Sequence, residues 1–163
     1  MRLGRPTDAP AIGVLLRRVM RRWVVPDQPS SAVAVLLAGA GSRAIRQEVL
    51  LGRRFHLAYV GTVLVGVAAI RDDSHLFQLH VSTRYQGQGI ARLLWQRVMR
   101  DSVKRSGTRH FTLNSAPMAV PVYRQLGFVE VGPERISPAG IRSTPMRLIL
   151  DAPNRRSKPG WQA

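Results

Sequence analysis

Three short apolar runs in the middle of the chain limit the folds that it can adopt. They read FHLAYV (55–60), TVLVGVAAI (62–70) and HLFQLHV (75–81), and their length and β-branched content are typical of strands. Gly61 separates the first two runs, and RDDS separates the second from the third. Such connections join antiparallel neighbours, because a parallel crossover needs about a dozen residues. The middle run is apolar on both faces, which predicts a central strand.

Helical spacing precedes and follows these strands. A start signal at 7–10 leads into one apolar stripe, formed by Ile12, Leu15, Leu16, Val19 and Trp23. A second helical region is expected over 31–51, with a break at 39–41, and a third over 89–105. The inward side chains expected in the third are Ile90, Leu93, Leu94 and Val98. Further elements are predicted as strands at 109–115, 127–132 and 144–150 and as a short helix at 119–126.

The length and composition predict a single globular domain over 1–151 and a basic, proline-rich tail over 152–163 that we expect to be disordered. Apolar residues make up 45% of the chain and cysteine is absent, which excludes disulfides, cysteine nucleophiles and thiolate metal sites. The first residues contain no apolar signal segment, and no apolar run is as long as a membrane span. We therefore expect a cytoplasmic location, no membrane contact and no metal ion.

The charge is strongly positive, with 25 basic and 9 acidic residues and a net charge of +16. Nearly all the basic residues are arginine. This balance favours an anionic partner such as nucleic acid, a phosphorylated cofactor or an acidic substrate. The arginines are scattered over all elements, so general solubility explains the charge equally well.

A glycine-containing segment, YQGQGIARLL (85–94), lies between the third strand and the third helix. Gly87 and Gly89 carry no Cβ that would keep a ligand from the backbone, and the first amides of a helix lack internal partners. Together with the helix dipole, these features predict an anion-binding cradle that suits phosphate. A Walker loop is excluded because Ile90 and Ala91 follow the glycine, and a Rossmann motif is excluded by the antiparallel strands before it.

Two blocks of the sequence resemble the GNAT superfamily of acetyl-CoA-dependent N-acyltransferases. The family signature [QR]-x-x-G-x-[GA] is matched by QGQGIA (86–91), which begins five residues after the strand-end Val81. The segment NSAPMAVPVYRQLGF (114–128) resembles the second block of the family, in which an Asn at a strand end precedes a helix with a Tyr and then Leu-Gly-Phe. The resemblance covers residues from about 3 to 150. It implies an α+β, three-layer fold whose mixed, mostly antiparallel sheet of six to seven strands is flanked by about four helices and splayed at the strands that bind CoA.

The resemblance also implies which residues bind acetyl-CoA. Backbone amides of the cradle would bind the pyrophosphate, and the strand end would pair with pantetheine and polarise the thioester carbonyl. The cradle residues are Gln86, Gly87, Gln88, Gly89, Ile90, Ala91 and Arg92, and the strand-end residues are Leu79, His80 and Val81. Asn114 and the helix from Ala119 to Tyr123 would contact the thioester.

The reaction implied is a direct attack of an amine on the thioester, which requires two proton transfers. Tyr123 matches the family tyrosine that protonates the departing thiolate, although an aromatic at this position could also serve packing alone. Counting six residues back from Val81 gives His75 as the base, with His80 and then Asp73 as alternatives, and a water chain without a dedicated base as another.

The acceptor is less defined by the sequence. Family resemblance places it between the first two helices and the loop joining the last strands, which directs attention to Trp23, Asp27 and Glu134. The chain has few acidic residues, and this disfavours a polycationic acceptor, because such sites usually need a cluster of carboxylates. We expect an N-acetyltransferase, acting as a monomer or homodimer on a primary amine of a small molecule, peptide or protein. The alternative is an RNA- or ribosome-associated acetyltransferase, or an idle CoA-binding module that docks on nucleic acid.

Overall fold

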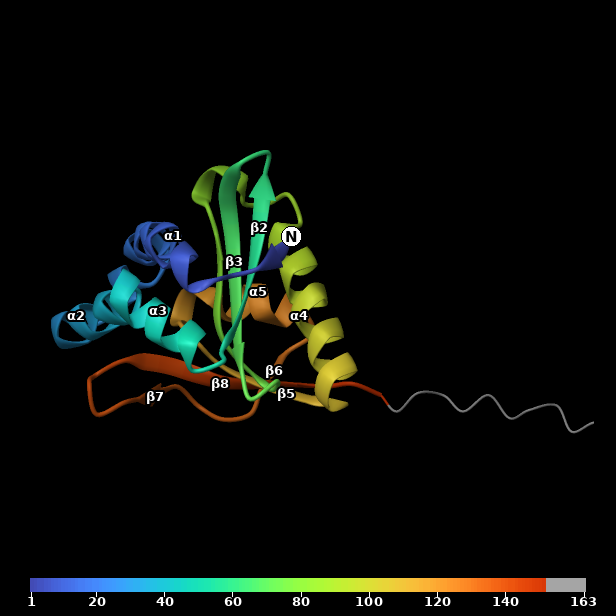
Figure 1. Cartoon of the computed structure of the whole chain (residues 1–163). Coiled ribbons are helices and arrows are strands. Elements are labelled where there is room, and N and C mark those ends of the chain that lie inside the picture. Colours follow the sequence, from blue (N-terminus) through green and yellow to red (C-terminus); the bar gives the residue numbers. More distant parts are fainter. Residues whose placement is uncertain (152–163) are drawn as a thin grey trace, which may run out of the picture.

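The computed structural model of the chain describes residues 1–151, so the predicted tail lies outside the described residues (Figure 1). The helices are α1 (Ala9–Trp23), α2 (Ser30–Gly39), α3 (Ser42–Leu50), α4 (Ile90–Ser106) and α5 (Val120–Gln125). The strands are β1 (Arg2–Leu3), β2 (Arg54–Val60), β3 (Val63–Arg71), β4 (His75–Val81), β5 (His110–Ser115), β6 (Val129–Glu130), β7 (Arg135–Ile136) and β8 (Arg142–Ile149). The predicted break between the second and third helices is confirmed.

The sheet follows the order β1-β2-β3-β4-β5-β8-β6, and β7 pairs with β8 outside this path. The hairpins β2–β3 and β3–β4 are antiparallel, as their short connections predict, and β4 pairs with β5 in parallel. The mixed, mostly antiparallel fold class is confirmed. The sheet has eight strands where six to seven were expected, because the two-residue strands β1 and β7 carry no periodic signal.

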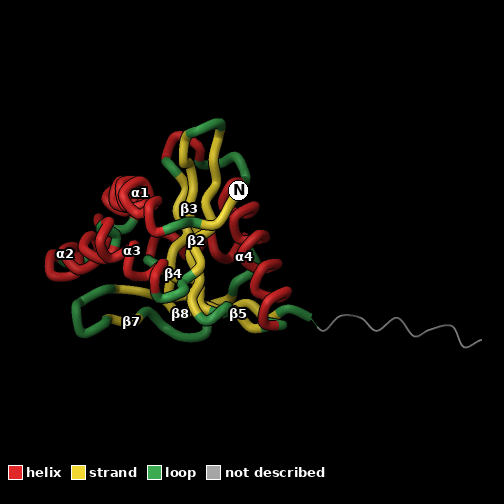
Figure 2. Tube along the Cα trace, viewed as in Figure 1, coloured by secondary structure: helices red, strands yellow, loops and turns green. Residues whose placement is uncertain are grey.

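Helices cover both faces of the sheet, which gives the three layers that were expected (Figures 1 and 2). On one face, α1 and α3 pack on β2 and β3 through a cluster that includes Ile12, Leu16, Ile45 and Leu57. On the other face, α4 packs on β3 and β4 through a second cluster that includes Leu94, Trp95 and Phe111. The predicted stripe of α1 is confirmed, with Trp23 partly buried at its end.

Helix α4 begins close above β3 because Gly66 leaves room for it. A Cβ at Gly66 would lie 2.8 Å from Leu94 Cδ1 and 3.2 Å from Ile90 Cγ2. Leu93 was expected to point inward, and this is wrong, since it is 53% exposed. Trp95 is buried instead, because the face of α4 on the sheet runs through 94, 95 and 98 and places 93 on the opposite side.

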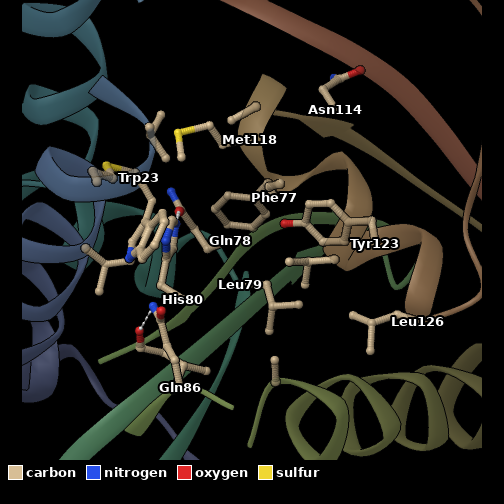
Figure 3. Close-up of a pocket in the computed structure, with 18 of the residues that line it drawn as sticks. Trp23, Phe77, Gln78, Leu79, His80, Gln86, Asn114, Met118, Tyr123 and Leu126 are labelled. Atoms are coloured by element: carbon tan, nitrogen blue, oxygen red, sulfur yellow. Dashed lines mark hydrogen bonds between the residues drawn. The ribbon is translucent and has the colours of Figure 1, made fainter. Parts of the chain in front are cut away.

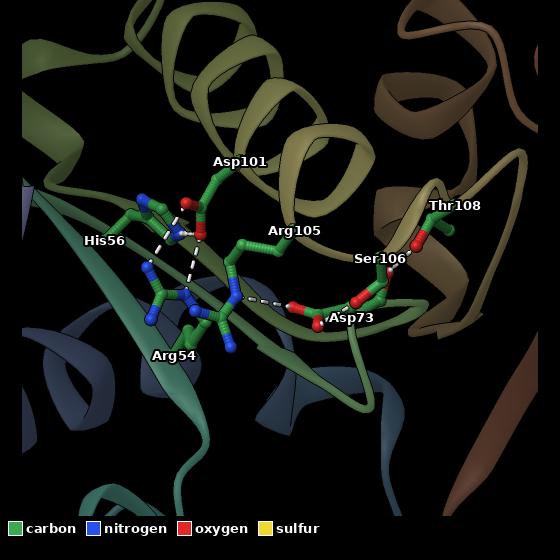
Figure 4. A network of polar contacts seen from close by, with 7 residues as sticks. All are labelled: Arg54, His56, Asp73, Asp101, Arg105, Ser106 and Thr108. Carbon is green, nitrogen blue, oxygen red and sulfur yellow. Dashed lines mark hydrogen bonds and ion pairs between the residues drawn. The ribbon is translucent and has the colours of Figure 1, made fainter.

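Polar contacts fix the far end of α4 to the hairpins (Figure 4). Arg54 on β2 donates to Asp101 on α4 at 2.6 and 3.2 Å, and His56 Nε2 lies 3.4 Å from Asp101 Oδ2. After α4, Ser106 Oγ and Thr108 Oγ1 donate to Asp73 in the turn before β4. The orientation of α4, and therefore of the segment before it, is held at both ends.

Strands β4 and β5 are joined at one end and separate toward the other. Their register contains one pair, His75 with Thr112, at the beginning of β4. Toward Val81 the two strands share no further register pair within residues 1–151. The splay that was expected from family resemblance therefore leaves the second half of β4 with a free edge, and the segment 82–89 follows at that edge.

Candidate functional site

The segment before α4 has the backbone geometry from which a phosphate cradle is predicted. Gly87 and Gly89 have φ values of 76° and 81°, in the left-handed region that favours glycine, and Gly89 is the N-cap of α4. Leu93 is the first residue whose amide bonds back into this turn, at 3.0 Å to Gly89 O. Within residues 1–151, the amides from 87 to 92 have no hydrogen-bond acceptor. These free donors stand at the positive end of a 17-residue helix, so the segment suits a phosphate.

The free edge of β4 presents a second set of backbone groups. The Ser82 N–H donates to Val65 O on β3 at 2.7 Å. Because main-chain groups alternate along a strand, those of Leu79 and Val81 point away from β3, into the gap. The Gln86 side chain already donates to Val81 O at 3.0 Å, which agrees with that direction. The amide groups of Leu79 and Val81 are therefore presented to an extended ligand beside β4.

One pocket connects the cradle, the gap and the space below α1 and α2 (Figure 3). Its volume is about 790 Å³, which is enough for an extended ligand and a second small molecule. Most of the residues predicted for CoA line it, namely Leu79, His80, Val81, Gln86, Gly87, Gly89, Ile90, Ala91, Arg92, Asn114, Ala119 and Tyr123. The side chain of Gln88 is exposed outside this lining.

Tyr123 projects from α5 toward the centre of this pocket (Figure 3). Its ring packs edge-on against Phe128, with centroids 6.0 Å apart. Its hydroxyl has no hydrogen-bond partner within the described part of the chain, so it is available to a ligand. Burial raises the pKa of Tyr123 to about 12, and the phenol therefore keeps its proton at neutral pH.

The two candidate bases on β4 lie in different places. His80 lines the pocket, whereas His75 does not. The His75 side chain lies at the other end of β4, where its Nδ1 is 2.8 Å from Thr112 Oγ1. Burial, followed by the charge of Arg71, lowers the pKa of His75. Asp73 is bonded to Ser106 and Arg105 in the turn before β4 and is likewise remote from the pocket.

Gln78 determines which nitrogen of His80 is free. The His80 Nε2 lies 2.8 Å from Gln78 Oε1, a carbonyl oxygen that can only accept, so Nε2 carries the hydrogen. The lone pair is then on Nδ1. Burial lowers the pKa of His80 to about 4, so the ring is neutral at physiological pH and Nδ1 can accept a hydrogen bond.

Phe77 belongs to the site because of a β-bulge that the sequence does not reveal. Ala69 pairs with Gln78 and Ile70 pairs with Leu76, so Phe77 is the extra residue of β4. Simple alternation would place Phe77 on the same face as Leu79. The bulge instead turns it to the face of α1, where its ring meets Phe55 edge-on at 5.8 Å.

Only one of the three residues expected at the acceptor end lines the pocket. Trp23 lines the pocket, but Asp27 and Glu134 do not. Both residues contact Arg142, whose guanidinium donates to the two carboxylate oxygens of Glu134 at 3.1 Å and to the main-chain oxygen of Asp27 at 3.0 Å. Arg142 itself lines the pocket, together with Leu36, Met118 and Ile141, which the sequence analysis did not single out.

Two further properties concern the described chain as a whole. In residues 1–151, no helix combines the length and apolarity needed to cross a membrane. The same residues contain no group of three or more His, Asp or Glu side chains placed to hold a metal ion.

Comparisons with known proteins agree with this geometry. Comparison with curated proteins gives no significant match. Among solved structures, a GCN5-related N-acetyltransferase from Rhodopseudomonas palustris has a TM-score of 0.79 at 18% identity, covering 91% of this chain and 94% of that one. The PaiA N-acetyltransferase from Thermoplasma acidophilum, in complex with coenzyme A, has a TM-score of 0.71 at 13% identity, covering 91% and 99%. The yncA protein from Salmonella typhimurium, with its cofactor acetyl-CoA, has a TM-score of 0.63 at 19% identity, covering 99% and 97%.

These likenesses show a shared fold, and the sequence itself shows the family. Residues 24–150 match the acetyltransferase (GNAT) domain, which is well over half of the chain. That stretch contains the cradle, the splayed strand β4 and Tyr123 on α5. The chain belongs to the GNAT family of acetyltransferases.

Proposed function

We propose that this protein transfers the acetyl group of acetyl-CoA directly to a primary amine. The observation that carries the proposal is one pocket whose lining includes the segment before α4, the free edge of β4 and, at the part called here the compartment below α1 and α2, side chains of those two helices. A two-substrate reaction needs such an arrangement, because the thioester and the amine must meet from different sides. The CoA or acetyl-CoA bound in the Thermoplasma and Salmonella proteins supports the same use of the cradle here.

Acetyl-CoA would lie along the free edge of β4. The amides from 87 to 92 bind the pyrophosphate, with the Arg92 guanidinium on the same rim of the pocket. Leu79 and Val81 pair with pantetheine through main-chain groups, as an added strand does. The free N–H groups there donate to the thioester oxygen as negative charge develops on it. Asn114 and Ala119 contact the thioester end from β5 and the start of α5.

The chemical step moves two protons in opposite senses. The amine nitrogen attacks the carbonyl carbon, the C–N bond forms and the C–S bond breaks. The nitrogen becomes more acidic as it gives up its lone pair, and His80 Nδ1 takes the proton that it loses. The thiolate takes the Tyr123 proton, and the proton gained by His80 then returns through solvent to the Tyr123 phenolate, which restores both side chains. No cysteine is available for an acyl-enzyme, in agreement with direct transfer.

We assign the base to His80, although the spacing in the sequence favours His75. His80 lines the pocket with a defined acceptor nitrogen, and His75 is bonded to Thr112 at the opposite end of β4. With a pKa of about 4, His80 is a weak base, but it is already deprotonated at every pH where the amine reacts. Its role is to accept the N–H as the new bond forms, rather than to remove a proton from an ammonium beforehand.

A nucleic-acid acceptor is the second candidate, supported by an arginine cluster on α1. Arg17, Arg18, Arg21 and Arg22 line a shallow surface cleft together with Val14 and Pro26. Val19, Met20 and Trp23 of the same helix line the pocket, and helical periodicity places them on the opposite side of α1 from the arginines. The arginine cluster therefore faces away from the pocket, so we favour the small amine.

Thermal melting tests the proposal at the level of binding. Saturating acetyl-CoA should raise the melting temperature, by an amount that grows with the logarithm of its concentration. Coenzyme A should do the same, and adenosine without phosphates should not. No shift with acetyl-CoA or CoA would overturn the proposal.

Product analysis separates the two candidate acceptors. Acetylated tRNA as the preferred product, instead of an acetylated small amine, would favour the nucleic-acid acceptor.

A further inference from the structure

The compartment below α1 and α2, which holds the acceptor if the proposed function is correct, has an apolar wall. Its wall is formed by Trp23, Val24, Leu36, Phe77, Met118 and Ile141, which come from five separate parts of the chain. Trp23, Phe77 and Met118 are labelled in Figure 3. Two of the six are aromatic, and Phe77 is brought there by the bulge in β4. Such a wall gains free energy from an apolar group, at a rate that increases with the area buried.

No acid is available to hold a cation in this compartment. None of the pocket-lining residues in the described chain is Asp or Glu. The charged residues of the lining are Arg92, at the cradle, and Arg142. The Arg142 guanidinium donates to Glu134 through two hydrogen bonds of 3.1 Å and to Asp27 O at 3.0 Å, so its donors are already used within the chain. A second charge on the acceptor, of either sign, would lose its water without gaining a partner.

Several polar side chains of the same compartment are already occupied by contacts within the chain. Gln28 is bonded in both directions to the main chain of Arg142, at 2.9 and 2.8 Å. Ser137 Oγ accepts the Ile141 N–H at 3.1 Å. Gln78 accepts from His80, which leaves the Gln78 NH₂ group and His80 Nδ1 as polar groups for a ligand, and the buried Trp23 Nε1 has no hydrogen-bond partner in the described chain either. One amine nitrogen suffices to satisfy the acceptor position at Nδ1.

We propose that the acceptor is a small primary amine joined to an aromatic or bulky aliphatic group, with no carboxylate and no second ammonium group. The proposal deepens the proposed function and depends on it. The ammonium form is excluded by the absence of a carboxylate, so the amine binds as the neutral base. Its apolar group rests against Trp23 and Phe77, and its nitrogen points toward His80.

A panel of amines tests this inference by kcat/KM with acetyl-CoA. Phenethylamine, ethanolamine, putrescine, phenylalanine and a short peptide with an N-terminal phenylalanine would be compared by release of free CoA and by product mass. Phenethylamine should exceed ethanolamine by about 10- to 100-fold, the value of burying one ring. Putrescine and phenylalanine should be at least as poor as ethanolamine. A preference for putrescine, phenylalanine or the peptide would overturn the inference while leaving acetyl transfer intact.

Adjacent positions on α2 offer a matched pair of variants. Leu36 lines the compartment, whereas Val35 is 48% exposed and lies outside the lining. Leu36→Glu should lower kcat/KM for phenethylamine at least about 10-fold, because a carboxylate replaces apolar surface against the ring. It should raise the putrescine-to-phenethylamine ratio, because the carboxylate can pair with the second ammonium group. Val35→Glu should leave both values within about twofold.

A second position covers the case in which Leu36→Glu does not fold. Met118 also lines the compartment and is 43% exposed, so Met118→Glu adds the same charge without entering the core. Binding of acetyl-CoA, measured by the melting shift, shows whether each variant keeps its fold and its cradle. An unchanged amine preference in both folded variants would overturn the inference. If the wild-type protein does not bind acetyl-CoA, the proposed function is refuted, and the inference about the acceptor falls with it.

Discussion

At the scale of single residues, the hydroxyl of Tyr123 carries a specific prediction. Its phenol faces the pocket without a partner in the described chain and keeps its proton, because burial raises its pKa to about 12. Tyr123→Phe keeps the ring and its contact with Phe128. Acetyl-CoA affinity should therefore change little, while single-turnover acetyl transfer should fall about 10²-fold or more, the usual scale for a positioned acid.

Tyr59→Phe is the matched control for that experiment. The Tyr59 hydroxyl accepts from Arg2 at 2.9 Å near the start of the chain and is not part of the pocket lining. Its loss should leave the transfer rate unchanged. If Tyr123→Phe transfers acetyl groups as fast as the wild-type protein, the tyrosine serves packing and another group protonates the thiolate.

His80 and His75 make a second pair at the residue scale. His80→Ala should lower single-turnover transfer by about 10²-fold with little change in acetyl-CoA affinity, because the acceptor for the amine proton is removed. His75→Gln keeps a polar partner for Thr112 and should stay within about twofold of the wild-type rate. The reverse pattern would return the base to His75. Gln78→Leu removes the contact that keeps the hydrogen of His80 on Nε2 but leaves the imidazole in place, so it should lower the rate less than His80→Ala does.

The pH profile of the wild-type rate separates two roles for His80. Since its pKa is lowered to about 4, the imidazole is unprotonated throughout the range from pH 6 to 9. The value of kcat/KM should then rise with pH along the titration of the acceptor amine, near its own pKa of about 10. An inflection near pH 6.5 that disappears in His80→Ala would show instead that the ring titrates normally during turnover.

At the scale of elements, the start of α4 can be tested separately from its stability. Gly89 and Gly107 cap the two ends of α4 with positive φ values of 81° and 66°, and a Cβ at either meets no atom within 4 Å. An alanine at either position should cost about 1 kcal/mol of stability through backbone strain. Only Gly89→Ala should also weaken acetyl-CoA binding, because its methyl group and altered backbone intrude on the cradle. Equal affinity in the two variants, by calorimetry, would place the pyrophosphate elsewhere.

The contact between β2 and α4 predicts how stability depends on pH. His56 is 3% exposed, and burial lowers its pKa to about 4, against about 6.5 in the unfolded chain. Between these values the unfolded chain binds more protons, so its contribution to stability is complete above about pH 6.5 and is lost as the pH falls toward 4. The loss should reach about 3 kcal/mol at most. Urea unfolding across this range measures it.

His56→Gln provides the comparison for that titration. Glutamine does not titrate, so the free energy of unfolding of the variant should fall less steeply than that of the wild-type protein between about pH 6.5 and 4. His80 shares the same direction of pKa shift, so part of the slope should remain. Parallel slopes for the variant and the wild-type protein would show that His56 is protonated in the folded state without cost.

Periodicity and turn signals predict most elements but not the details that complete the site. The stripe of α1, the hairpins β2–β3–β4 and the glycine turn before α4 follow from residue spacing, since each is a local pattern. The bulge at Phe77 does not, because it depends on the pairing of β4 with β3. The sequence does not reveal that His75 is remote from the pocket for a similar reason. Counting residues back from Val81 does not show where β4 separates from β5, and this separation determines which residues of β4 line the pocket.

At the scale of the whole molecule, the net charge of +16 should act on acetyl-CoA binding through the ionic atmosphere. The arginines are spread over several elements, and several pair with acids, as Arg2 does with Asp8 and Arg54 with Asp101. The remaining excess attracts the phosphates of CoA over distances up to about 10 Å at 0.1 M salt. Acetyl-CoA affinity, measured by calorimetry, should therefore fall as the salt concentration rises about tenfold, from about 0.05 to about 0.5 M. Salt-independent affinity would show that local amides alone set the binding.

The two layers of helices contribute different residues to the pocket. Tyr123 of α5 and the segment before α4 line it from one side of the sheet, and Trp23 of α1 and Leu36 of α2 line it from the other. In the proposed function, the first set binds acetyl-CoA and the second binds the amine. The family and the fold follow from sequence blocks that a single chain displays, whereas the lining that Trp23, Leu36 and Phe77 give to the pocket depends on long-range packing.

The central claim is that acetyl groups pass from acetyl-CoA to an amine in this pocket. Mass spectrometry of a reaction containing the protein, acetyl-CoA and equal concentrations of an amine, a peptide and tRNA tests it most directly. We expect the acetylated apolar amine as the main product, one CoA thiol released for each acetyl group transferred, and both formed about 10²-fold more slowly in Tyr123→Phe. Acetyl-CoA that remains intact in the presence of every acceptor would contradict the claim.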